Sequence, residues 1–236
     1  MSQPFDAAAD LRDAPRVEGA RLRPRDAATL ILVRRDPPEP RVLMGRRAEG
    51  HVFMASKWVF PGGRIDRADF RAPCASELRP EVAAAVGRAA PPARARALAL
   101  AAVRETFEET GLLLAKPAPP RPAAGPWRDF LARGALPDLE ALDYVARAIT
   151  PPGRSRRFDA RFFMADAARL MHLDPEPGAE MELDEIAWIS LEETRGLDLP
   201  QITRFVLGEL TDRLRDPGRP PPVVRMVRGR HVIERD

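Results

Sequence analysis

Residues 104–111 read Arg-Glu-Thr-Phe-Glu-Glu-Thr-Gly, and this octapeptide constrains the fold more than any other part of the chain. Its glutamates, Glu105, Glu108 and Glu109, stand at positions i, i+3 and i+4, which share one face of an α-helix. Three carboxylates within about one turn repel one another unless a cation lies among them, and divalent cations such as Mg²⁺ and Ca²⁺ prefer oxygen ligands. The alternative interpretation is an ordinary solvated acidic face.

The residues around the octapeptide favour a helix with a defined end. The run from Arg94 to Val103 is rich in Ala and Leu, which have high helix propensity. Gly111 then provides a residue that readily adopts the left-handed conformation found at helix C-termini. The glutamates are therefore expected on the last turns of a long helix.

A second motif, Phe60-Pro61-Gly62-Gly63, lies upstream. With it, the octapeptide and the following Leu112 resemble the two ends of the Nudix signature, although Thr106 stands where that signature has an aliphatic residue. Gly63 and Arg104 are 41 positions apart, which implies an insertion of roughly 27 residues relative to the compact signature. The insertion is placed mostly at 64–92, and the glutamate normally found between the two halves is not assigned.

The resemblance covers about residues 29–210 and implies an α/β Nudix fold, with a mixed β-sheet between α-helices. A helix-compatible stretch at 76–89 predicts that the insertion is helical. We expect the extra chain to loop outward, so that it shapes substrate choice and not the metal site. Met54, the run 60–69, the octapeptide and the run 149–163 follow one another in this order. That order is similar to a Nudix branch with a split signature that includes coenzyme A diphosphatases of peroxisomes and mitochondria.

The same resemblance implies a metal site. Its expected ligands are Glu105, Glu108, Glu109 and a backbone carbonyl of Gly63, and its expected ion is Mg²⁺ or Mn²⁺. The carbonyl could reach the site because the glycines at 62 and 63 let the backbone approach closely. Arg104 would orient the glutamates through a charged hydrogen bond.

Members of the family often add a carboxylate from a loop opposite the helix, as a metal ligand or general base. The candidates are Glu180, Glu182 and Glu185, and Glu182 is preferred. An acidic surface loop is an equally good explanation of each, because a pattern without geometry does not identify a base.

The implied activity is metal-dependent hydrolysis of a nucleoside diphosphate linked to another moiety, with coenzyme A or acyl-coenzyme A as the preferred substrate. One alternative is a pyrophosphatase for ADP-ribose, dinucleotides or nucleotide sugars. The other is a Nudix module that senses a nucleotide without turnover, in which the glutamates would usually be lost. The expected partner is thus a small nucleotide-diphosphate substrate.

Several side chains near these motifs are candidates for contacting such a substrate. Those for phosphate are Arg46, Arg47, Lys57, Arg156 and Arg157, and those for stacking on a base are Phe53, Trp58, Phe162 and Phe163. Each is individually better explained as a solvated charge or a core aromatic. The three histidines are isolated from one another, so no zinc site is expected.

The composition is that of a globular protein. With 236 residues and 44% hydrophobic content the chain can bury a core. Residues 26–236 are expected to form a single domain after a flexible, charged segment at 1–25. The net charge is only +3, and there is no continuous basic stripe, so no nucleic-acid partner is expected.

Other features of the sequence bear on the cellular compartment of the protein. The N-terminus does not have a basic stretch followed by an apolar core, and no run approaches the roughly 18 apolar residues of a membrane span. A single cysteine, Cys74, fits a reducing compartment. We therefore expect a cytoplasmic protein without a membrane partner, and a homodimer is left open.

Hydrophobic periodicity and turn residues predict the remaining elements. Strands are expected at 27–33, 41–44, 58–60, 112–115, 158–165 and 185–189, with a terminal hairpin at 221–227 and 231–233. Helices are expected at 127–133, 138–146 and 200–214. A helical turn is expected at 191–194, capped by Ser190.

Overall fold

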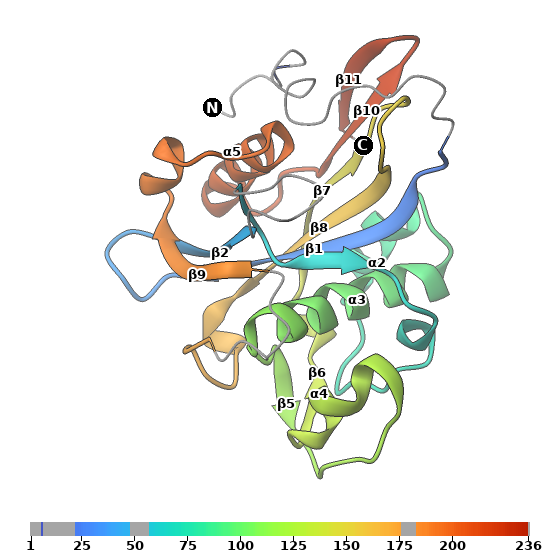
Figure 1. Ribbon diagram of the computed structural model, residues 1–236, viewed down its shortest axis with the longest axis vertical. Helices are drawn as coiled ribbons and strands as arrows, with labels where there is room; N and C mark the ends of the chain where they lie inside the picture. Colours follow the sequence, from blue (N-terminus) through green and yellow to red (C-terminus); the bar gives the residue numbers. More distant parts are fainter. Residues whose placement is uncertain (1–5, 7–21, 48–56, 176–182, 236) are drawn as a thin grey trace.

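The computed structural model describes residues 6, 22–47, 57–175 and 183–235. Within these ranges a mixed β-sheet lies between two helical layers, as predicted (Figure 1). Helices α2 (Pro80–Gly87) and α3 (Pro92–Thr110) cover one face, and α5 (Gln201–Arg215) covers the other.

The strands of the main sheet follow the order β11-β10-β7-β8-β1-β2-β3, with β4 paired to β1 and β9 to β2. Their bounds are β1 Arg25–Arg34, β2 Arg41–Arg47, β3 Trp58–Val59, β4 Gly62–Arg64, β7 Asp143–Ile149, β8 Phe158–Asp166, β9 Leu183–Ser190, β10 Pro222–Val227 and β11 Arg230–Arg235. A small separate sheet pairs β5 with β6, and the short helices complete the chain: β5 Ala115–Pro117, β6 Ala135–Pro137, η1 Arg67–Phe70, η2 Gly125–Trp127, α4 Arg128–Ala132, η3 Leu139–Ala141, η4 Ala167–Arg169 and η5 Glu193–Gly196.

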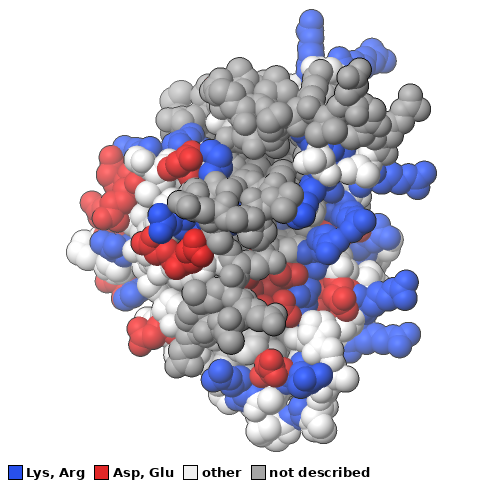
Figure 2. Space-filling view, in the orientation of Figure 1, with Lys and Arg blue, Asp and Glu red and all other residues white. Residues whose placement is uncertain are grey.

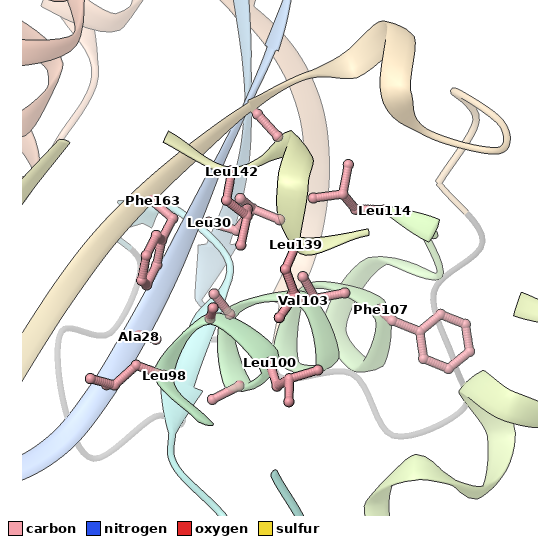
Figure 3. Packing of buried hydrophobic residues seen from close by; sticks show 14 of the residues in the cluster. Ala28, Leu30, Leu98, Leu100, Val103, Phe107, Leu114, Leu139, Leu142 and Phe163 are labelled. Atoms are coloured by element: carbon pink, nitrogen blue, oxygen red, sulfur yellow. The ribbon is translucent and has the colours of Figure 1, made fainter. Parts of the chain in front are cut away.

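Strand β1 lies at the centre and divides the hydrophobic residues between two cores. Alternate side chains point to opposite faces of a strand, so Leu30 and Leu32 pack against α3, whereas Ile31 and Val33 pack on the α5 side. Figure 3 shows Leu30 of β1, Phe163 of β8 and residues of α3 meeting in the first core. Both faces of the central strand are thus buried.

Helix α3 ends where the sequence predicts, and a proline lies at its start. Pro92 occupies its first turn, where the missing N–H costs nothing. Gly111 has φ 75° and donates its N–H to the carbonyl of Phe107 at 2.7 Å, which ends the helix after Thr110. The octapeptide therefore forms the last turns of α3.

Most other expected elements are present, including α5 and the terminal hairpin. The helical turn expected at 191–194 begins two residues later, as η5 with Glu192 at its N-cap, although Ser190 Oγ accepts the Glu193 N–H at 3.2 Å. Strand β1 begins at Arg25, inside the segment expected to be flexible, and most of that segment lies outside the described residues. None of the helices in the described ranges is both long and apolar enough to cross a membrane.

The helix expected at 138–146 is wrong. Residues 139–141 form the short η3, and 143–149 form β7, which pairs with β8 and β10. This Ala-containing run has no decisive periodicity, and its two neighbouring strands supply the hydrogen bonds that make it extended. The strand expected at 112–115 is also displaced, because only Ala115–Pro117 pairs with β6.

The insertion contains the predicted helix, α2, but it does not loop outward. Its Ala72, Val82, Val86 and Ala90 are buried in the core shared with α3. Arg79 of the same segment donates to the carbonyl of Leu142 at 3.0 Å. The extra residues therefore form part of the hydrophobic core.

Candidate active site

The two halves of the interrupted motif meet between β4 and the end of α3. The N–H of Gly62 donates to Glu109 Oε2 at 3.0 Å. The Cα of Gly63 lies so close to Glu105 that an added Cβ would be 2.3 Å from its carboxyl carbon. A side chain at position 63 would therefore displace the Glu105 carboxylate, and the predicted close approach of this loop is confirmed. A metal-ligand role for the Gly63 carbonyl remains a prediction.

Arg104 binds the glutamates of its own helix. Its Nη1 donates to Glu105 Oε1 at 3.0 Å and to Glu108 Oε2 at 2.8 Å. Nη2 donates to the carbonyl of Arg64 at 3.0 Å. The remaining guanidinium donors go to Asp69, so all five N–H groups are used. Arg104 thus has the contacts expected of a residue that orients these carboxylates.

Asp69 is the functional candidate that the sequence did not reveal. It is fully buried and accepts from Arg104 Nε at 2.9 Å and Nη2 at 3.0 Å. Trp127 Nε1 donates to the same carboxylate at 2.9 Å, and the Asp66 N–H at 2.8 Å. In the sequence, Asp69 lies between the two halves of the motif, and in the structure it binds Arg104 of the second half. The available signal was its position soon after Gly63, in the Asp66–Asp69 capping box.

The first residues of the segment assigned to the insertion take part in the site. Residues 64–69 belong to the site, because Arg64 and Asp69 both accept hydrogen bonds from Arg104. The segment assigned to the insertion therefore includes residues that contact Arg104, and its bounds at 64–92 remain a prediction. Sequence spacing alone did not show which side of the insertion carried the missing carboxylate.

The charges of the site are coupled. Burial alone would lower the pKa of Arg104, but its hydrogen bonds with Asp69 and the charges of Glu105 and Glu108 outweigh that effect and raise it. Burial raises the pKa of Glu108 above its usual range, and Arg104 opposes that rise. One buried guanidinium thus serves several carboxylates, and additional positive charge would be favourable here.

The carboxylate oxygens of Glu105, Glu108 and Glu109 are the kind of ligand that a hard divalent cation prefers. In the structure, however, they do not converge on one point. Among the described residues, no three carboxylate, histidine or cysteine side chains are grouped to hold a metal. Oxygens of Glu105 and Glu108 are directed to Arg104, and one of Glu109 to Gly62. Each carboxylate has two oxygens, so metal binding requires these side chains to turn the other oxygen toward the ion.

The three candidates for an additional carboxylate from an opposite loop fall into two groups. Glu180 and Glu182 lie outside the described residues. Glu185 lies within β9 and forms an ion pair with Arg46 at 3.3 Å. Its neighbour two positions on, Ala187, packs on the α5 side of the sheet, so Glu185 projects away from α3. Glu185 is thereby removed as a candidate general base.

The other proposed contacts are mostly engaged elsewhere. Lys57 pairs with Asp198 at 2.7 Å, and Arg157 donates to the carbonyl of Thr150 at 3.0 Å. Phe162 and Phe163 are buried in opposite cores and are not available to stack on a base. Phe53 lies outside the described residues.

Acidic side chains gather near the centre of the face shown in Figure 2, beside a group of basic residues at its right-hand edge. On the described part of α3, the acidic residues are Glu105, Glu108 and Glu109. Arg64 and Arg67 are exposed on the adjoining β4 and η1. An anionic ligand at this site would therefore meet basic residues as well as carboxylates.

No family model matches the chain. It is 29% identical to the acyl-coenzyme A diphosphatase of Gallus gallus, over 59% of this chain and 54% of that protein. It is 32% identical to the acyl-coenzyme A diphosphatase of Homo sapiens, over 55% of this chain and 49% of that protein. The chain thus spans about half the length of the curated relatives that it matches.

Solved structures show the same fold. A NUDIX hydrolase from Alicyclobacillus acidocaldarius is 29% identical with a TM-score of 0.59, over 80% of this chain and 91% of that one. The NUDIX domain of Shewanella oneidensis NrtR, complexed with ADP ribose, has a TM-score of 0.50 at 13% identity, over 89% of this chain and 99% of that one. At that identity the likeness concerns the fold alone.

Proposed function

We propose that this chain, which belongs to the Nudix superfamily by sequence and fold, is a metal-dependent hydrolase of the diphosphate bond in a nucleoside diphosphate linked to another moiety. The observation that carries the proposal is the junction of the two halves of the motif. Arg104 holds Glu105 and Glu108, while Gly62 holds Glu109. A solvated acidic face would not require the 3% exposure of Arg104 or the close approach of Gly63.

In this proposal Glu105, Glu108 and Glu109 hold Mg²⁺ or Mn²⁺, together with the carbonyl of Gly63. A divalent ion bound there would neutralise charge on the diphosphate and make the attacking water more acidic. Arg104 keeps the glutamate side chains oriented, and Asp69 keeps Arg104 in place. Glu182 remains the proposed general base.

The proposed substrate is coenzyme A or an acyl-coenzyme A. The two diphosphatases that share 29% and 32% identity with this chain support this choice. Hydrolysis would give a phosphopantetheine and adenosine 3′,5′-bisphosphate. Cationic side chains near the diphosphate would then recognise the 3′-phosphate, because guanidinium–phosphate contacts are charge-assisted and can be bidentate.

The test is a substrate panel with Mg²⁺ and, separately, Mn²⁺, with products identified by mass spectrometry. The substrates are coenzyme A, its 3′-dephospho form and ADP-ribose. We expect kcat/KM for coenzyme A to exceed that for the dephospho form by roughly tenfold to a hundredfold, the effect of losing one charged hydrogen bond of about 1.5–3 kcal/mol.

Two results would redirect the proposal. Preference for ADP-ribose, or equal efficiencies for the two coenzyme A forms, would indicate a pyrophosphatase for nucleotide sugars or dinucleotides. Binding of a nucleotide without turnover of any substrate would indicate a sensing module.

A further inference from the structure

Asp69 is saturated with hydrogen bonds. Its two oxygens accept four donors: Arg104 Nε and Trp127 Nε1 on Oδ1, and Arg104 Nη2 and the Asp66 N–H on Oδ2. A carboxylate offers about four acceptor sites. Asp69, Arg104 and Trp127 are each no more than 3% exposed. Water therefore does not readily replace a donor that is lost.

Trp127 is the one donor in this set that comes from outside the motif and its capping turn. It lies in η2, 58 residues from Asp69, between the sheet strands β5 and β6. Its ring meets that of Phe130 edge-on at 5.2 Å, and Phe130 meets Phe107 of α3 in the same way at 5.2 Å. Phe107 stands between Glu105 and Glu108 in sequence. The 125–132 segment is thus attached to the glutamate-bearing turns through both polar and aromatic contacts.

We propose that Trp127 is a positioning residue for the metal site and acts through Asp69 and Arg104; this inference rests on the metal site of the proposed function. Arg104 divides its donors between Asp69 on one side and Glu105 and Glu108 on the other. The Trp127 N–H fixes the Asp69 carboxylate and so keeps Arg104 drawn toward it. If Asp69 is free to move, Arg104 follows the glutamates more closely and competes with a metal ion for their oxygens.

The test is direct binding of Mn²⁺ to the full chain, measured by the electron paramagnetic resonance signal of free Mn²⁺, without substrate. Trp127→Phe keeps an aromatic ring but removes the N–H. We expect it to raise the Kd for Mn²⁺ roughly three- to tenfold. This is less than the roughly tenfold to hundredfold typical of removing a group bonded directly to a metal ligand.

Leu131→Val is the matched control. Leu131 is buried in α4 of the same segment, so its truncation loosens packing there and leaves the indole donor in place. We expect this variant to lose thermal stability while its Kd for Mn²⁺ stays within about twofold of the wild-type value. If Trp127→Phe does not fold by circular dichroism, Trp127→Leu also removes the donor and carries the same expectation.

An unchanged Kd in the Trp127 variant, or an equal rise in the Leu131 control, would overturn the positioning role while leaving the proposed function intact. Failure of the wild-type chain to bind Mn²⁺ would overturn the metal site itself, and this inference with it.

Discussion

Glu105, Glu108 and Glu109 occupy one turn of α3, yet their carboxylates have different surroundings. Glu109 is buried and accepts from a backbone N–H, whereas Glu108 keeps 36% of its side chain exposed and has a pKa raised by partial burial. A substitution at one of them therefore removes a proposed ligand with its own surroundings and not one of three equivalent charges.

Glu108→Gln should remove most turnover and leave the fold intact. The substitution replaces one carboxylate oxygen by an NH₂ group and removes the negative charge, so the side chain becomes a weaker ligand for a hard cation. We expect kcat to fall on the order of a hundredfold. Steady-state kinetics in saturating Mg²⁺ measures this change. Glu185→Gln makes the same chemical change on the opposite side of the sheet and should retain activity. Full activity of Glu108→Gln would refute the assignment of this residue.

Gly63→Ala tests the close approach of β4 to α3. The added methyl would overlap the Glu105 carboxylate at 2.3 Å, so that side chain must move, and activity should fall at least roughly tenfold. Gly87→Ala is the control, because nothing lies within 4 Å of a Cβ built there. Equal activities of the two variants would show that Glu105 tolerates displacement.

At the scale of elements, the insertion differs most between what the sequence predicts and what the structure contains. Its expected function is to shape substrate choice without touching the metal site. Asp69, which was counted within it, instead binds Arg104. A deletion of 64–92 would therefore disturb the site as well as the core.

Val86→Ala in α2 tests the contribution of the insertion to stability. Val86 is 1% exposed within the core shared with α3. Removing two buried carbons should lower the free energy of unfolding by about 1–3 kcal/mol, measured by urea denaturation. Glu81→Ala, on the exposed side of the same helix, should change it by less than about 0.5 kcal/mol. An unchanged free energy of unfolding in Val86→Ala would show that α2 packs only loosely against the core shared with α3.

At the scale of the whole molecule, the C-terminal hairpin is joined to α5 by a buried carboxylate. Glu209 is 1% exposed and lies within reach of two guanidinium groups: Arg235 Nη1 donates to it at 2.8 Å and Arg219 Nε at 3.1 Å. Burial opposes ionisation of Glu209, but the two arginines outweigh it and lower the pKa of the carboxyl. This cluster therefore contributes stability only while Glu209 is ionised.

Glu209→Gln should accordingly destabilise the protein by about 1–3 kcal/mol at pH 7. A carboxyl with a lowered pKa adds stability above the unfolded-state value of about 4.3, and the gain disappears as pH falls through the folded-state pKa. The difference between the wild type and the variant should therefore shrink below about pH 4. Urea denaturation across this range measures it, and a difference independent of pH would exclude the ion pairs as its source.

The sequence by itself determined the features that depend on neighbouring residues. The octapeptide specifies a helix face, and Gly111 its end, because contacts at i+3 and i+4 are decided within one turn. The central strand follows from its continuous apolar run at 27–33, which is typical of a strand buried on both faces. The approach of Gly62 and Gly63 to the glutamates was also anticipated, since glycine pairs there imply close backbone contact.

Only the tertiary structure decided which distant groups complete the site. Asp69 and Trp127 are separated from their partners by 35 and 58 residues, and no local periodicity encodes such pairings. The same holds for β7, which becomes a strand because β8 and β10 satisfy its backbone. Burial then makes these contacts strong, because an unpaired carboxylate or guanidinium in the interior costs far more than one in water.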